Sequence, residues 1–562
     1  MRKLWLLLLL CTLVACTVGE TPVPTATPVL PTATPLPPTA TPTPLPLGAR
    51  SGWWNDAVFY EVFVRSFYDS DGDGVGDLQG LIEKLDYLND GDPATDDDLG
   101  VTGIWLMPIM DSPSYHGYDI VDYYRVEPDY GTNEDFKALI DAAHERGIRV
   151  IIDLVINHTS SAHPWFINSA GGEDAERRAW YVWSDEQQDY RGPWGQQVWY
   201  RRGDGWYYAV FWSEMPDLNY EHPAVTAEIY DVAEFWLEEM GADGFRLDAV
   251  RYLIEDDLLT ATPRLATTEE TLGWLEAFRE HYVAVESEAM TVGEVWSHTQ
   301  EVNHYLEEGA LDLAFEFDLA EAIISAVGSG SPAALRSHMR QVQQVYADSH
   351  YATFLTNHDQ ERVMERLRGD VDRMKLAAAT YLTLPGVPFV YYGEEIGMVG
   401  HKPDELLRTP MQWTAEAEAG FTTGRPWQAV NRDYAEVNVA SQDEDPDSLL
   451  SHYRRLIHLR HAHPALHTGA FMPVESSDGL VYPFLRLEDG DRVLVVLNFS
   501  GRPRAEVVLQ VEESSLAEGR YRALDALSAL EVEIEVGAGG AFEVALPPLE
   551  AQQPLIFILK GE

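Results

Sequence analysis

The strongest constraint on the fold is a repeated alternation of short apolar runs with helical patterns through the middle of the chain. The runs are rich in valine, isoleucine and aromatic residues, and segments with helical hydrophobic spacing, such as residues 133–146 and 224–240, lie between them. Eight runs separated by helices predict an α/β fold, a (β/α)8 TIM barrel of parallel strands. The predicted strands are residues 58–64, 103–107, 150–156, 244–247, 291–295, 311–317, 353–356 and 388–392.

Two segments depart from this alternation. Residues 159–220, after the third predicted strand, show no helix–strand repeat and contain many tryptophans, which indicates an inserted domain. After a predicted helix at 449–461 the pattern changes to short strands separated by turns, which predicts a C-terminal all-β sandwich domain. We therefore expect a catalytic barrel over residues 51–465, interrupted by the insertion, and a β domain over 466–562. The predicted strands of that β domain are residues 480–487, 492–498, 505–511 and 542–546.

The first fifty residues have the pattern of an export signal and a linker. Arg2 and Lys3 precede an apolar run that is too short for a stable membrane span, and small residues follow it. This predicts a signal peptide over residues 1–15. The sequence before Cys16 resembles the bacterial lipobox, which implies cleavage before Cys16 and lipidation of its sulfur; an ordinary signal peptide is the alternative. Residues 16–50 then form a Thr/Pro-rich linker, and we expect an extracellular protein, lipid-anchored to the bacterial cell membrane.

Composition excludes some partners. Ninety-two acidic residues against 39 Lys and Arg give a formal charge of −53, which repels phosphate backbones, so nucleic-acid binding is not expected. The two cysteines, Cys11 and Cys16, both lie in the leader, so we expect no disulfide and no cysteine metal site in the folded body.

Polar residues gather where predicted barrel strands end. Three carboxylates (Asp248, Glu294 and Asp359) and Arg246 fall at such ends, the face on which barrel enzymes carry their catalytic groups. Cleavage of a glycosidic bond needs one carboxyl group to protonate the leaving oxygen and one carboxylate to stabilise or attack the sugar carbon. Arg246 shares a strand face with Asp248 and would keep it ionised, whereas crowded negative charge would raise the pKa of Glu294. Each motif alone is equally compatible with a structural ion pair, but their joint occurrence in this order favours catalysis.

With these motifs the chain resembles the α-amylase family of glycoside hydrolases from Trp53 to the C-terminus. The matching segments are 153–158, 215–219, 244–248, 293–296 and 354–359.

The resemblance implies a retaining mechanism. In it Asp248 is the nucleophile, Glu294 is the acid/base, and Asp359 binds and distorts the sugar at the cleavage subsite. The other residues implied to hold that sugar are Tyr118, His158, Arg246 and His358. The insertion would be the family's B domain and the terminal β region its C domain.

Residues 69–77 have the composition of a calcium loop. Aspartates alternate with glycines there, and hard oxygen ligands at this spacing suit Ca²⁺. The loop is not an EF-hand, because Gly80 stands at position twelve and a strand precedes it; a solvated acidic turn is the alternative. The resemblance implies a structural Ca²⁺ as cofactor, and Asn157 matches a second calcium ligand of many α-amylases. The ligands implied for the loop are Asp69, Asp71, Asp73, the Val75 carbonyl and Asp77.

The sequence indicates less clearly which subgroup of the α-amylase family the chain resembles. Residues 215–219 lie between the forms typical of oligo-1,6-glucosidases and neopullulanases, while 408–413 and 420–424 resemble the former. Exo-acting members usually carry an aspartate three residues before the stacking tyrosine, where this chain has Tyr115, which suggests an open cleft. After the nucleophile, Arg251 and Tyr252 replace the Lys-His of many α-amylases, so contacts beyond the cleaved bond are expected to differ.

We therefore expect an endo-acting α-amylase that hydrolyses α-1,4-glucosidic bonds in starch, glycogen or maltodextrins. The alternatives are an exo-acting α-glucosidase, oligo-1,6-glucosidase or transglycosylase, a trehalose-forming mutase, and a non-catalytic surface glucan-binding protein.

Overall fold

The computed structural model describes residues 52–346, 350–528 and 530–562. The predicted signal peptide, Cys16 and the linker lie outside the described residues. Among the helices that are described, none is long and apolar enough to cross a membrane.

The central element is a sheet of eight parallel strands in the order β11-β10-β9-β5-β2-β1-β13-β12. A parallel bridge between Phe315 and Ala352 joins the two outer strands, so the sheet closes into a barrel. This confirms the predicted (β/α)8 fold; β11 and β12 are shorter than their apolar runs. The strands are β1 Phe59–Val62, β2 Gly103–Leu106, β5 Arg149–Leu154, β9 Gly244–Leu247, β10 Met290–Gly293, β11 Leu313–Ala314, β12 Ala352–Thr353 and β13 Val387–Tyr391.

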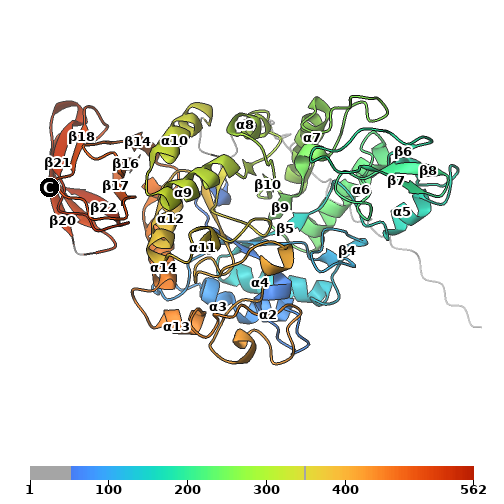
Figure 1. Ribbon diagram of the computed structural model, residues 1–562, viewed down its shortest axis with the longest axis horizontal. Helices are drawn as coiled ribbons and strands as arrows, with labels where there is room; N and C mark the ends of the chain where they lie inside the picture. The colour runs from blue at the N-terminus through green and yellow to red at the C-terminus, as the bar shows by residue number, and fades with distance from the viewer. Residues whose placement is uncertain (1–51, 347–349, 529) are drawn as a thin grey trace, which may run out of the picture. The chain divides into compact units, whose positions relative to one another are not determined.

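Helices connect and surround these strands (Figure 1). The predicted helix at 133–146 is α4, which begins with a capping box between Thr132 and Asp135. The predicted helix at 224–240 is α6, which begins at Pro223 and continues into a π-helical turn, Phe235–Glu239. The helices of the barrel and its connections are α1 Val64–Phe67, α2 Leu78–Glu83, α3 Leu85–Leu88, α4 Asn133–Glu145, α6 Pro223–Glu234, α7 Glu269–Val285, α8 Thr299–Glu307, α9 Phe317–Ser329, α10 Ala333–Val345, α11 Val363–Arg366, α12 Val371–Thr383, α13 Val439–Asp443 and α14 Leu449–Ala462.

The barrel interior has an apolar layer with a polar layer above it. Phe59 and Phe389 stack inside the barrel with ring centroids 4.4 Å apart, and Trp105 packs beside them. Because successive side chains of a strand alternate between faces, Glu61 of β1 and Asp153 of β5 also point inward, two residues beyond Phe59 and Ile151. The strands thus deliver charged groups to the carboxyl end of the barrel.

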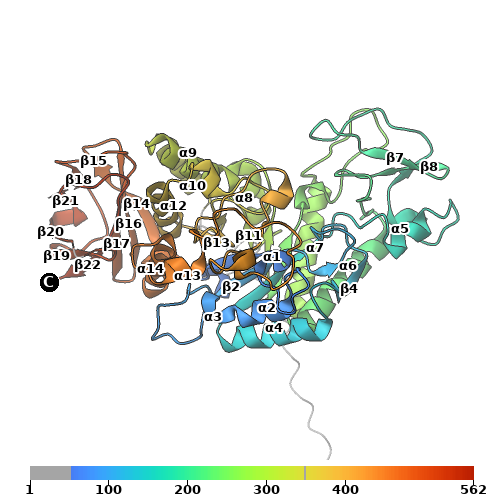
Figure 2. The ribbon, with the colours of Figure 1, turned by 60° about the horizontal axis from the view of Figure 1, so that its bottom comes forward.

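Residues 159–220 form a small unit between β5 and α6. It contains α5 Pro164–Ser169 and a three-stranded antiparallel sheet of β6 Trp183–Ser184, β7 Trp199–Arg202 and β8 Gly205–Tyr208; Figure 2 shows α5, β7 and β8 at the right of the view. Several of its aromatic residues, including Trp180 and Trp199, are buried and form its own core.

A hairpin outside the insertion, β3 Met110–Asp111 with β4 Asp122–Val126, carries the loop that contains Tyr118.

The C-terminal region is all β, as predicted. A six-stranded sheet, β14-β16-β17-β22-β19-β20, and a three-stranded sheet, β15-β18-β21, share one apolar core. The strands are β14 Ala470–Pro473, β15 Glu475–Ser476, β16 Val481–Glu488, β17 Asp491–Asn498, β18 Val508–Val511, β19 Gly519–Asp525, β20 Glu531–Val536, β21 Phe542–Ala545 and β22 Pro554–Gly561.

Five of these strands were not predicted: β14, β15, β19, β20 and β22. The sequence of strand β20, Glu-Val-Glu-Ile-Glu-Val, alternates strictly between charged and apolar residues, which is enough to predict a strand. Strand β19 carries two arginines and no β-branched residue, so its sequence does not indicate a strand.

Candidate active site

Arg246 is the centre of the polar layer. Its guanidinium is fully buried and donates from Nη1 to both Asp153 oxygens, at 2.9 and 3.0 Å, and to Asp248 Oδ1 at 2.6 Å. Its Nη2 donates to Glu294 Oε2 at 2.7 Å. Close approach of β9 to β10 places this arginine, since a Cβ at Gly244 would lie 2.2 Å from the Met290 carbonyl oxygen. One cation therefore binds carboxylates from three strand ends.

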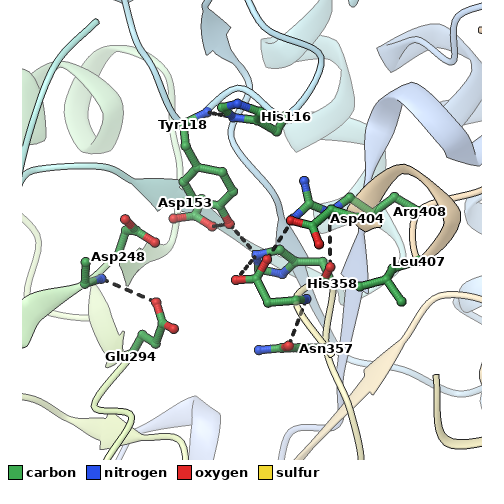
Figure 3. A network of polar contacts seen from close by, with 12 residues as sticks. His116, Tyr118, Asp153, Asp248, Glu294, Asn357, His358, Asp404, Leu407 and Arg408 are labelled. Atoms are coloured by element: carbon green, nitrogen blue, oxygen red, sulfur yellow. Dashed lines mark hydrogen bonds and ion pairs between the residues drawn. The ribbon is translucent and has the colours of Figure 1, made fainter. Parts of the chain in front are cut away.

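Asp248 and Glu294 face the same space above the barrel (Figure 3). Burial raises the pKa of Glu294 to about 7, and the nearby Asp248 and Asp359 carboxylates add to that effect while Arg246 opposes it. Crowded negative charge was the predicted cause; burial is the larger one. A carboxyl group that is partly protonated at neutral pH suits a general acid.

His358 links the groups on the other side of the site. Its Nδ1 lies 2.6 Å from Glu61 Oε1, and its Nε2 lies 2.7 Å from the Tyr118 hydroxyl, which donates to Asp153 Oδ2 at 3.0 Å. Burial alone would lower the pKa of His358, but the Asp359 and Glu61 carboxylates outweigh burial and raise it to about 9. The imidazole is therefore a cation that donates from both nitrogens, and the Tyr118 ring stacks on it with centroids 5.6 Å apart.

Asp359 is bound by a second arginine. Arg408 donates from Nη2 to Asp359 Oδ1 at 2.7 Å and from Nε to the His358 carbonyl at 3.1 Å. Although burial acts in the opposite direction, His358 and Arg408 lower the pKa of Asp359 and keep it ionised. His158 differs from His358, because burial lowers its pKa; its Nε2 lies 3.1 Å from the Tyr118 carbonyl.

All seven residues predicted to act on the sugar come together here. Tyr118, His158, Asp248, Glu294 and Asp359 line one pocket of about 550 Å³, and Arg246 and His358 bind these residues from below. The other lining residues are His116, Trp194, Phe211, Met215, Ala249, Arg251, Tyr252, Trp296, Asp404 and Arg408.

Two residues of this network were missed from the sequence. Glu61 is a single acidic residue inside an apolar strand, a pattern that indicates a buried and paired charge. Arg408 was noted only as part of a subgroup motif, because nothing near it in the chain indicates that it would reach Asp359, 49 residues away.

The predicted calcium loop brings part of its ligand set together. Carboxylate oxygens of Asp69, Asp71 and Asp77 lie within 4.8 Å of one another, which suits a hard cation. Asp69 is buried and accepts from the amides of Asp71, Gly72 and Gly74 at 2.7–3.1 Å. Asp73 is exposed and accepts from the amide of Val75 at 2.8 Å.

Asn157 lies beside the carboxyl group of Asp217 where the insertion meets the barrel, and Asp217 in turn lies close to Glu255. A bridge between His158 and Asp217 brings the two chain segments together. Asn157 Oδ1, Asp217 Oδ2 and Glu255 Oε1 are all buried without a hydrogen-bond partner. Burial raises the pKa of both carboxyl groups, that of Asp217 to about 8, and a bound cation would reverse this.

Comparison with known proteins agrees with this geometry. Residues 61–469 match the family model for the α-amylase catalytic domain. The chain is 40% identical over 458 residues to α-amylase 3 of Dictyoglomus thermophilum, covering 81% of this chain and 86% of that protein. It is 32% identical to an oligo-1,6-glucosidase of Parageobacillus thermoglucosidasius, covering 80% and 90%. The crystal structure of an α-amylase from H. orenii superposes with a TM-score of 0.77 at 41% identity, covering 90% of this chain and 99% of that one. The match covers the barrel with its site, and the chain belongs to the α-amylase family of glycoside hydrolases.

Proposed function

We propose that the protein is a retaining, endo-acting α-amylase that hydrolyses α-1,4-glucosidic bonds in starch-like glucans. The observation that carries the proposal is the pairing of Asp248 and Glu294 on the two terminal nitrogens of Arg246. Neighbouring nitrogens of one guanidinium keep the two carboxyl groups close, as a retaining enzyme needs with a spacing of about 5 Å, whereas an inverting enzyme leaves room for a water.

Each group then has a defined role in the reaction. Asp248, held by Arg246, attacks the anomeric carbon and forms the glycosyl-enzyme bond, while Glu294 gives its proton to the leaving oxygen. Glu294, now a carboxylate, takes a proton from the water that releases the sugar from Asp248. Tyr118 offers a ring face to the bound sugar and Asp359 binds its hydroxyls, while the cationic His358 holds both of these residues in place from below.

Internal attack is favoured by Tyr115. This residue occupies the place of the aspartate that closes the pocket in exo-acting relatives. Its ring stacks on Trp427 at a centroid distance of 5.3 Å, and the Arg408 guanidinium lies 5.8 Å from it. An aromatic ring held in this way provides no carboxylate to bind a chain end, so a glucan can continue past this point.

We expect the enzyme to cleave maltoheptaose that is blocked at its non-reducing end, because endo attack needs no free chain end. Reducing-sugar release and product sizes by chromatography measure this. Asp248→Asn is the control and should lower the rate by roughly 10⁴-fold or more with unchanged circular dichroism. If only unblocked substrate is cleaved, the exo-acting alternative holds. Trehalose formed from maltose would favour a mutase, and starch binding without cleavage a binding protein.

We expect kcat/KM to fall as pH rises through about 7. The general acid must be protonated, and the pKa of Glu294 is raised to about 7, so activity declines about tenfold per pH unit above it. A maltosyl fluoride is the matched control, because fluoride leaves without needing a proton. For this substrate, kcat/KM should not fall as the pH rises above about 7. The same alkaline limb on both substrates would contradict the role of Glu294.

We propose that the loop of Asp69, Asp71 and Asp77 holds a structural Ca²⁺, with Asn157, Asp217 and Glu255 as a second candidate set. A chelator should then lower Tm, because a ligand bound only by the folded state stabilises it. Asp71→Asn should remove most of the shift if the loop is responsible, and Asp217→Asn if the second set is. A Tm that does not change with the chelator would exclude both.

We propose that the enzyme is exported and anchored to the bacterial membrane through lipid on Cys16. In the native bacterium, Cys16→Ser should move the protein from the membrane fraction to the medium or leave it unprocessed, and should abolish labelling by a palmitate analogue. Cys11→Ser is the control and should behave as wild type. Retained labelling of the Cys16 variant would refute the anchor.

A further inference from the structure

The pocket has two chemically different sides. On one side are the groups that form the network around His358 and Asp359, which are mostly charged or polar. On the other side is an aromatic row, defined here as Phe211, Trp194 and Tyr252.

Each member of the aromatic row contacts both of the others. The centroid of Phe211 lies 5.4 Å from that of His158 and 5.5 Å from that of Trp194. The centroid of Trp194 lies 5.4 Å from that of Tyr252. The centroids of Phe211 and Tyr252 also lie 5.8 Å apart, so the three rings pack together beside His158, at the edge of the cleavage site.

Trp194 is exposed although it lies in a pocket. Its exposed fraction is 59%, which is unusual for so large an apolar side chain. The turn that carries it is braced, because its backbone amide donates to Gln196 Oε1 at 2.9 Å and Gln196 Nε2 donates to the Val210 carbonyl at 2.7 Å. A fixed aromatic face left open beside a catalytic pocket is suited to stacking on a sugar ring.

The row lies on the side of the general acid. Tyr252 follows Arg251, whose Nη1 donates at 2.7 Å to the carbonyl of Trp296, two residues after Glu294. Glu294 protonates the leaving oxygen, so the chain beyond that oxygen passes along this side. On the basis of the proposed function, we propose that Trp194, supported by Phe211 and Tyr252, binds a glucosyl residue on the reducing-end side of the cleaved bond.

Two substrates separate this subsite from the rest of the pocket. Maltoheptaose places sugars on both sides of the cleaved bond, whereas α-maltotriosyl fluoride places only fluoride on the leaving side. Trp194→Ala should lower kcat/KM for maltoheptaose roughly tenfold and change that for the fluoride less than twofold. Trp194→Phe, which keeps an aromatic face and tests the proposal if the alanine variant folds poorly, should retain most of the maltoheptaose activity.

Trp212 supplies the matched control. It is 54% exposed and near Trp194 in sequence, but it does not line the pocket, so Trp212→Ala should change neither rate. Equal losses on both substrates, or no loss on maltoheptaose, would overturn the subsite. A wild-type protein that cleaves the fluoride but not maltoheptaose would refute the proposed function instead, and this proposal with it.

Discussion

The active site depends on the pairing of one buried guanidinium with three carboxylates. Arg246 is inaccessible to solvent, and burying such a charge is costly unless it is paired and hydrogen-bonded. Asp153 pairs with one of its terminal nitrogens from the neighbouring strand, and Asp248 and Glu294 add two further ion pairs. The same arrangement sets the chemistry, because Asp248 is held beside a positive charge while Glu294 is desolvated enough to keep a proton. Removing Arg246 would leave carboxylates buried without their counter-charge.

On the other side of the pocket, a second buried cation compensates the negative charge of Glu61 and Asp359. His358 is charged because Glu61 and Asp359 both contact it, and Arg408 adds a further positive charge beside Asp359. Acidic and basic groups thus alternate around the pocket, which lets several carboxylates stay close together without all becoming protonated. The barrel makes this possible, since its strands end at one face and each end contributes a group at a fixed position.

Sequence patterns predicted much of this, for physical reasons. Strand ends in a parallel barrel meet, so acidic residues after apolar runs could be assigned to one site before their contacts were known. The pairing of Glu61 with His358 spans 297 residues and that of Arg408 with Asp359 spans 49, and no local pattern encodes either. The missed strand β19 shows a different limit of prediction from local sequence. Its own residues have little β propensity, and its pairing with β20 and β22 stabilises it as a strand.

The sequence by itself determined the barrel, the β region that follows it and the carboxyl groups at the strand ends, since these follow from local periodicity and from the order of the strands. Only the tertiary structure decided how charge is shared among those groups. Burial, more than the neighbouring negative charges, raises the pKa of Glu294, and burial is a property of the folded chain. The tertiary structure also separated core tryptophans of the insertion, such as Trp180 and Trp199, from the exposed Trp194 and Trp212, because spacing along the chain does not reveal which side a ring faces.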